Sequence, residues 1–219
     1  LVVLEHSGVN QDGRSSSLTA PNGPSQQTLM TDVLLRAGVR GGVIGRLEMH
    51  GTGTSLGDPI EVGAALEVFA SPSSAARHTA RPGHALTLEG AKPRAGHCEP
   101  GAGVVGMLFA MSHITERTMA PLVHLRVLNP HVEAAARRSA RVQHARVPTL
   151  PRQVAPRPWT VGSESGRGEL ASTPLSRSGV SGFAFQGTNA HAIICRRYSP
   201  VEQHLSAYTN QTYTMLRSW

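Results

Sequence analysis

Two histidines and a lysine lie in loops that follow short apolar runs. His50 ends the run VIGRLEMH and is followed by the small residues GTGTSLG, while Lys92 and His97 lie in KPRAGHCEPGAG. Two imidazoles and an ammonium group can stabilise the negative charge that develops on a carbonyl oxygen or an enolate. The hydroxyls of Thr52 and Thr54 suit a polar, uncharged ligand such as an amide chain. These residues indicate a pocket for a carbonyl substrate; the alternative is an ordinary strand, turn and helix in which His50 has no role.

The residues around these loops predict an α/β layered domain. Apolar runs bounded by turn residues predict strands at residues 1–8, 43–50, 85–90, 178–185 and 190–197. Helical spacing predicts helices at residues 25–38, 59–70 and about 100–113, with Ser25 as the cap of the first. Residues 114–178 are rich in Pro and Arg, and we expect little regular structure there. Strands that alternate with helices favour a layered fold whose ligands bind at the carboxyl ends of the strands.

Composition argues against several classes of protein. The formal net charge is +7, but the basic residues gather at 134–147 without interleaved aromatic residues, so no nucleic-acid partner is expected. Cys98 and Cys195 are too few for a disulfide framework, and no CxxC pair indicates a metal site. There is no run of about 18 apolar residues and no signal peptide, so we expect a cytoplasmic protein without a membrane partner. The chain lacks an initiating Met, which suggests a fragment.

Two other patterns have less support. GAGVVG matches the GxGxxG sequence of dinucleotide-binding loops, but Glu99 and Pro100 separate it from the preceding strand, and Glu99 would repel a pyrophosphate. Cys98 adjoins a histidine, but neighbours in sequence seldom meet as nucleophile and base, so we expect a small buried residue at a helix start. The histidines outside the four stretches described next, His113 among them, are expected to be exposed to solvent.

Four stretches, taken in order, resemble the signatures of the β-ketoacyl synthase family. They are NQDGRSSSLTAPNGPSQQ, HGTGTSLGDPIEVGA, the pattern K-x-x-x-G-H and GTNAH. The chain is similar to the C-terminal half of the ketosynthase domain of a modular (type I) polyketide synthase. The resemblance covers residues 1–195, which we expect to form a partial ketosynthase domain, followed by a tail at 196–219.

The resemblance implies a thiolase-like α/β fold, with a mixed sheet flanked by helices, and an acyltransferase activity. In this family a decarboxylative Claisen condensation joins an acyl chain held on a cysteine to a malonyl unit. The malonyl unit arrives on the phosphopantetheine of an acyl carrier protein, so no cofactor or metal is expected to bind directly. The partners implied are this carrier protein, a missing N-terminal ketosynthase half and, in the complete domain, a second copy in a homodimer.

The resemblance also implies roles for individual residues. His50 and His97 bind the malonyl thioester carbonyl and stabilise the enolate, and Lys92 orders His97 and the local charge network. The residues expected at the substrate are Thr52 and Thr54 for the pantetheine amides, Phe185 as a gate whose backbone N–H helps form the oxyanion hole, and Gly187 and Thr188 in the same turn.

Several departures from the family pattern bear on activity. No segment like the TACSSS motif of the nucleophilic cysteine is present, so we expect the isolated chain to be inactive. Pro93 and Arg94 replace small and amide residues, and Pro93 is expected to push Lys92 toward an extended backbone. Ala184 and Gln186 replace glycines near the gate. The alternative functions are a non-catalytic module that docks a carrier protein and, with less support, a nucleotide-binding oxidoreductase.

Overall fold

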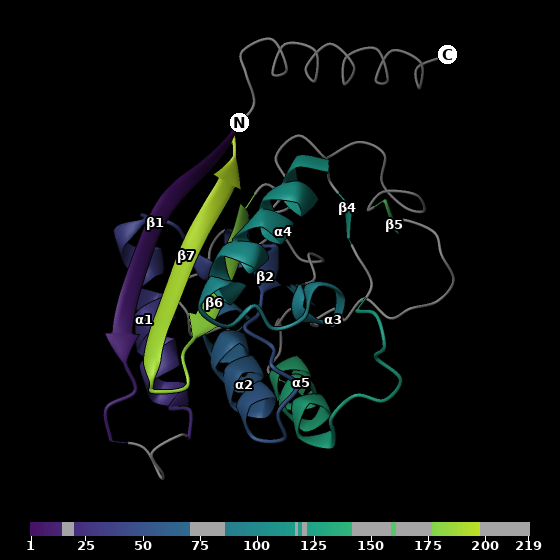
Figure 1. Ribbon diagram of the computed structural model, residues 1–219. Helices are drawn as coiled ribbons and strands as arrows, with labels where there is room; N and C mark the ends of the chain where they lie inside the picture. The colour runs from purple at the N-terminus through teal and green to yellow at the C-terminus, as the bar shows by residue number, and fades with distance from the viewer. Residues whose placement is uncertain are drawn as a thin grey trace.

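Five strands of the described residues form one mixed sheet. The computed structural model describes residues 1–14, 20–70, 86–116, 118–119, 122–141, 159–160 and 177–197. The strands of the sheet are, in spatial order, β1 (Val2–Gln11), β7 (Thr188–Arg196), β6 (Arg177–Phe183), β2 (Arg46–Glu48) and β3 (Thr87–Glu89). β7 is antiparallel to both β1 and β6, whereas β2 is parallel to both β6 and β3 (Figure 1). The carboxyl ends of β2, β3 and β6 therefore meet at one edge.

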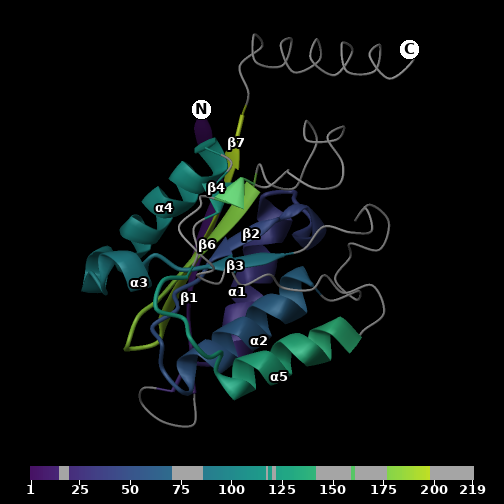
Figure 2. The ribbon, with the colours of Figure 1, turned by 90° about the vertical axis from the view of Figure 1, so that its right-hand side faces the viewer.

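Helices cover both faces of this sheet (Figure 2). α1 (Gly23–Arg36) and α2 (Gly57–Phe69) lie on one face, where α5 (Pro130–Arg141) packs against α2, and α4 (Ala102–Glu116) lies on the other. The shorter segments are α3 (Lys92–Ala95), two 3₁₀ turns at Gly41–Val43 and Glu99–Gly101, and the pair formed by β4 (Thr118–Met119) and β5 (Trp159–Thr160). Among the described helices, none is both long and apolar enough to cross a membrane.

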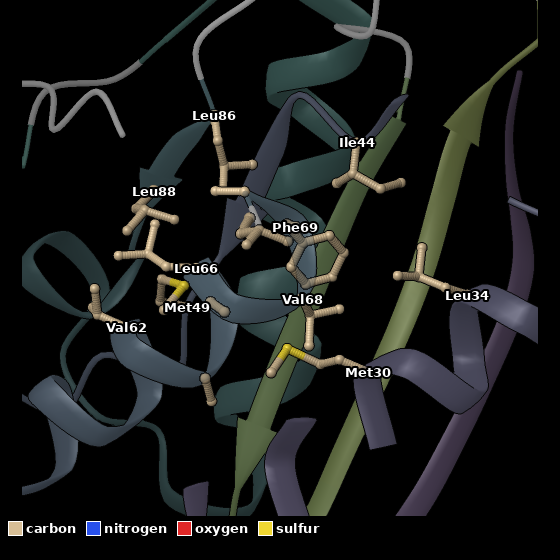
Figure 3. Close-up of a cluster of buried hydrophobic side chains, with 14 of the residues drawn as sticks. Met30, Leu34, Ile44, Met49, Val62, Leu66, Val68, Phe69, Leu86 and Leu88 are labelled. Atoms are coloured by element: carbon tan, nitrogen blue, oxygen red, sulfur yellow. The ribbon is translucent and has the colours of Figure 1, made fainter. Parts of the chain in front are cut away.

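The larger hydrophobic core lies between the sheet and the helices α1, α2 and α5 (Figure 3). Leu47 of β2 and Leu88 of β3 join this core, whereas the neighbouring Glu48 lies under α4. Successive strand residues point to opposite faces, so each short central strand serves both layers. A smaller cluster on the α4 side contains Ala110, Ile114, Val180 and Ile194.

The predicted strands and helices are confirmed, but their ends differ. β1 continues to Gln11, where a loop was expected, because it pairs with β7 along its whole length. α1 begins at Gly23, and its cap is Asn22 rather than Ser25. The Asn22 side-chain oxygen accepts the N–H of Ser25 at 3.2 Å, which satisfies one of the free donors of the first turn. β2 ends at Glu48, so His50 lies beyond the strand.

The expectation of little regular structure between residues 114 and 178 is wrong for α5. This helix begins after Asn129, whose side-chain oxygen accepts the N–H of His131 at 2.9 Å. Its alanines favour a helix, and Val132 and Ala135 are buried in the larger core. Tertiary burial of one face therefore stabilises a segment whose composition suggested a loop. Nearly all of the tail predicted at 196–219 lies outside the described residues.

Candidate functional site

The predicted catalytic residues lie at the edge where the parallel strands end. His50 follows β2, Lys92 follows β3 as the first residue of α3, and His97 lies between α3 and α4. Phe183, the last residue of β6, brings its ring centroid within 5.8 Å of that of His50. Because parallel strands align their carboxyl ends, residues distant in the sequence converge here.

The rings of the two predicted histidines lie edge to face. Their ring centroids are 5.7 Å apart and their planes are inclined by 85°. Nδ1 of His97 accepts the backbone N–H of Glu99 at 3.0 Å. In a neutral imidazole one nitrogen accepts and the other donates, so we assign the proton of His97 to Nε2. His97 is exposed and His50 is half-buried.

Lys92 contacts His50 in two ways. Its Nζ donates a hydrogen bond to the backbone carbonyl oxygen of His50 and lies 3.5 Å from the Nδ1 of the same residue. An ammonium group can only donate, so this Nδ1 accepts and the proton of the imidazole lies on Nε2. Burial, the Lys92 ammonium and His97 lower the pKa of His50 to about 4, which keeps it neutral at physiological pH. The contacts of Lys92 are thus with His50, whereas the resemblance implied that it orders His97.

Two carboxyl groups that sequence reasoning did not single out support the loop after His50. Glu61 accepts the backbone N–H of His50 at 2.6 Å and that of Gly51 at 2.9 Å, and Asp58 accepts the N–H of Gly53 at 3.0 Å. Burial raises the pKa of Glu61 to about 7, although both N–H donors oppose this shift. Both acids lie in the first turns of α2, and their place directly after a glycine-rich loop was the available signal.

The threonines of this loop lie close together. Their hydroxyl oxygens are 3.3 Å apart, and the hydroxyl of Thr54 also accepts the backbone N–H of Gly57 at 3.1 Å. Thr54 thereby satisfies a donor at the start of α2. Thr52 is half-buried and Thr54 is exposed, and both lie in the loop that follows His50.

The predicted gate lies in the turn between β6 and β7. Phe185 has 80% of its surface exposed, and Gly187 donates its N–H to the carbonyl of Ala184. Gly187 has a φ of +83°, and a side chain there would lie 3.1 Å from the Cβ of Asp12. The Thr188 hydroxyl accepts a hydrogen bond from Gln11 of β1 at 2.9 Å. Only glycine fits where this turn meets the loop after β1.

Three expectations about individual residues are wrong. Lys92 is helical rather than extended, because the ring of Pro93 fits the first turn of α3, where its missing N–H needs no partner. Cys98 is exposed rather than buried. His113 is buried rather than solvated, because its Nδ1 lies 2.8 Å from a carboxylate oxygen of Glu89 beneath α4.

The described residues also bear on the competing patterns. They contain no group of three or more His, Cys, Asp or Glu side chains that could hold a metal ion. GAGVVG spans the 3₁₀ turn and the start of α4, and the helix α3 separates it from the end of β3. A dinucleotide-binding loop connects its strand directly to its helix. This arrangement does not support nucleotide binding.

Comparison with known proteins identifies the family. The model of the β-ketoacyl synthase C-terminal domain matches residues 1–126. Mycoketide-CoA synthase of Mycobacterium tuberculosis is 37% identical over 194 residues, which make up 89% of this chain and 4% of that protein. An erythronolide synthase of Saccharopolyspora erythraea is 35% identical over 198 residues, covering 89% of this chain and 5% of its own length. The chain belongs to the β-ketoacyl synthase family.

Solved ketosynthase structures share the fold of this β-ketoacyl synthase chain. The ketosynthase from module 6 of the bacillaene synthase of Bacillus subtilis has a TM-score of 0.68 and 28% identity, covering 90% of this chain and 30% of that one. An oxazolomycin ketosynthase domain of Streptomyces albus has a TM-score of 0.67 and 26% identity with the same coverage. The expected resemblance to the C-terminal half of a polyketide ketosynthase and the thiolase-like fold are confirmed. The chain spans about a third of the solved ketosynthase chains and a twentieth or less of these curated relatives.

Proposed function

We propose that this chain supplies the decarboxylation side of a ketosynthase active site, in which His50 and His97 bind the carbonyl oxygen of a malonyl thioester. The observation that carries the proposal is the pair of adjacent imidazoles, whose ring centroids are 5.7 Å apart. Each has its Nδ1 occupied by a donor, from Lys92 in one case and from the backbone of Glu99 in the other. Each therefore has an Nε2–H available for the same oxygen.

Two neutral donors suit the charge that this reaction develops. When the bond between the malonyl carboxylate and the α-carbon breaks, carbon dioxide leaves and the electron pair forms an enolate on the thioester oxygen. Preorganised donors stabilise such an oxyanion, and the loss of one typically costs on the order of 10²–10³ in rate. The enolate carbon then attacks the acyl group on the cysteine, whose thiolate is released. The lowered pKa of His50 supports a role as hydrogen-bond donor rather than as a cation.

The surrounding residues fit the remaining roles. Thr52 and Thr54 present two adjacent hydroxyls in the loop after His50, where they would contact the amides of the phosphopantetheine arm. Among the described residues, the Phe185 N–H has no acceptor, although the N–H groups of Ala184 and Gly187 are engaged. This free donor supports its assignment to the oxyanion hole of the acyl thioester. Gly187 and Thr188 hold the turn against β1.

The chain carries no cysteine suited to hold the acyl group. Cys195 is buried in β7, and exposed Cys98 directs its thiol toward the carbonyls of Ala95 and Gly96. We therefore assign the nucleophile to an N-terminal ketosynthase half, with which this chain forms the complete site and, in the complete domain, a homodimer. The acyl carrier protein delivers the malonyl unit. The isolated chain is expected to be inactive.

The test is release of labelled carbon dioxide from malonyl carrier protein. The chain is mixed with a separately expressed N-terminal ketosynthase half, and each half is also assayed alone. We expect release only from the mixture and a strong loss in His50→Ala and His97→Ala. Binding of the carrier protein without release above the level of the N-terminal half would contradict the proposal and favour a non-catalytic docking module.

A further inference from the structure

A buried carboxyl group lies under the site and has no role in the proposed reaction. Glu48, the last residue of β2, is 2% exposed and faces α4. A Cβ added to Gly106 of α4 would lie 3.1 Å from the Cγ of Glu48, so the helix rests directly on this side chain. An ionisable group in such a place is costly unless it forms hydrogen bonds.

One oxygen of this carboxyl group bonds to the segment that carries Lys92. Oε1 of Glu48 accepts the backbone N–H of Ala91 at 2.6 Å, and Ala91 is the residue before α3. The Nζ of Lys92 in turn donates to the carbonyl of His50, two residues after Glu48. Covalent and hydrogen bonds thus close a ring through Glu48, His50, Lys92 and Ala91. The backbone bond from Met49 to Glu89, at 2.9 Å, joins the same two strand ends.

We propose that Glu48 is a positioning residue, which holds Lys92 against His50 through the N–H of Ala91 and so keeps the His50 imidazole neutral and correctly oriented. The proposal rests on the function proposed above for His50. Without this acceptor, the segment that begins α3 loses one of its hydrogen bonds to the end of β2. The Lys92 ammonium is then held beside Nδ1 of His50 only by its own bond to the His50 carbonyl, and we expect it to move away more often.

The charges around Glu48 fit this role. Glu89 lies in register with Glu48 on β3, and Glu61 of α2 and Lys92 of α3 also influence its charge. The residues that face Glu48 from α4 and β6, Gly106 and Val180, carry no charge. Arg46 on the same strand and His113 on α4 pair with Glu89. Burial raises the pKa of Glu48 to about 7, and Glu89 and Glu61 add to this shift while the Ala91 N–H and Lys92 oppose it.

The second oxygen argues against a role in packing alone. Oε2 of Glu48 is buried and has no hydrogen-bond partner among the described residues. A leucine would fill similar space without a desolvation cost, so the carboxyl group is unfavourable for stability by itself. Burial lowers the pKa of Lys92, and the carboxyl groups of Glu61, Glu48 and Asp58 counter this effect.

The test uses the fact that Lys92 is the only lysine in the sequence. Chain with labelled lysine and histidine gives one lysine side-chain signal by NMR, and the His50 signal is assigned by its loss in His50→Ala. Glu48→Leu keeps the approximate volume and removes the acceptor, whereas Glu48→Gln keeps an acceptor oxygen. Ala91→Pro removes the donor at the other end of the bond, where the φ of −77° is compatible with proline. Glu67→Gln, on the exposed side of α2, is the control.

In Glu48→Leu and Ala91→Pro, the Lys92 signal should move toward that of an exposed lysine. The pKa of His50 should rise by about one pH unit or more, because a neighbouring cation is lost. Glu48→Gln and the control should leave both signals near the wild-type positions. An unchanged His50 titration in either folded variant that breaks the bond would overturn the proposal.

Activity provides a second, separate readout. In the mixture with the N-terminal half, Glu48→Leu should lower carbon dioxide release at least tenfold, and Glu48→Gln should restore most of it. Should the wild-type mixture release no carbon dioxide, the proposed function fails, while the NMR result still decides the role of Glu48. Equal loss of release in both variants, with unchanged NMR signals, would show that Glu48 does not act through Lys92.

Discussion

The buried carboxyl group of Glu61 should make the stability of this chain depend on pH. Glu61 lies in the first turns of α2, is 4% exposed and accepts two backbone N–H groups of the His50 loop. Its pKa rises from 4.5 to about 7 on folding, mainly because of burial. A carboxyl group with a raised pKa binds more protons in the folded than in the unfolded state between these values. Its contribution to stability is present in full below pH 4.5 and is lost as pH rises through 7.

The expected magnitude follows from the size of this pKa change. Each pH unit corresponds to about 1.4 kcal/mol, so the free energy of unfolding should fall by about 2–3 kcal/mol between pH 5 and pH 8 because of Glu61 alone. Glu61→Gln keeps one acceptor oxygen and removes the ionisation. Between pH 5 and pH 8, the free energy of unfolding of Glu61→Gln should therefore rise relative to that of the wild type by about 2–3 kcal/mol.

Urea unfolding followed by circular dichroism, at several pH values from 5 to 8, measures this difference. Glu67→Gln removes an exposed carboxylate from the same helix, and its curve should run parallel to that of the wild type. The residual pH dependence of Glu61→Gln should reflect Glu48, whose pKa is also raised to about 7 by burial, and, with the opposite sign, His50 and His191, whose pKa values burial lowers to about 4. Parallel curves for Glu61→Gln and the wild type would refute the reasoning, because Glu61 would then ionise alike in both states.

Three further outcomes are expected. In a reconstituted ketosynthase, His50→Ala and His97→Ala should each lower condensation by about 10²–10³ and acyl loading far less, because only the extender carbonyl uses both imidazoles; equal rates in wild type and variants would contradict these roles. Gly106→Ala should destabilise the chain by about 1–3 kcal/mol in urea unfolding, because the added Cβ would press on Glu48. Gly103→Ala is the control: its added Cβ meets nothing within 4 Å, so it should stabilise the chain by about 0.5–1 kcal/mol. The isolated chain should self-associate in size-exclusion chromatography through the exposed apolar side of α4, and a monodisperse monomer would contradict this.

Local patterns predicted the elements that carry the site. The apolar run before His50, the turn residues after it and the helix that contains Pro59 all lie close to their predicted places. These signals are readable because strand and helix periods and turn chemistry depend on neighbours in the chain. The resemblance to the family motifs then predicted that His50, His97 and Lys92 act together, and the structure brings these three side chains close to one another.

Other features depended on tertiary contacts that no local pattern encodes. α5 forms in a segment of loop-like composition because Val132 and Ala135 are buried against α2. His113 is buried because Glu89 of a distant strand lies 2.8 Å away. The partner of Lys92 was assigned to His97, which is near in sequence, yet its contacts are with His50 across the ends of two parallel strands.

The sequence by itself determined the order of the five sheet strands and of α1, α2 and α4, the family and the residue types available for chemistry. Only the tertiary structure decided which nitrogen of each imidazole carries a proton, because that depends on Lys92 and on the backbone of Glu99. It also decided the electrostatics of the site. The pKa values of Glu48 and Glu61 rise because packing removes them from water, and burial is a property of the fold rather than of the neighbouring residues.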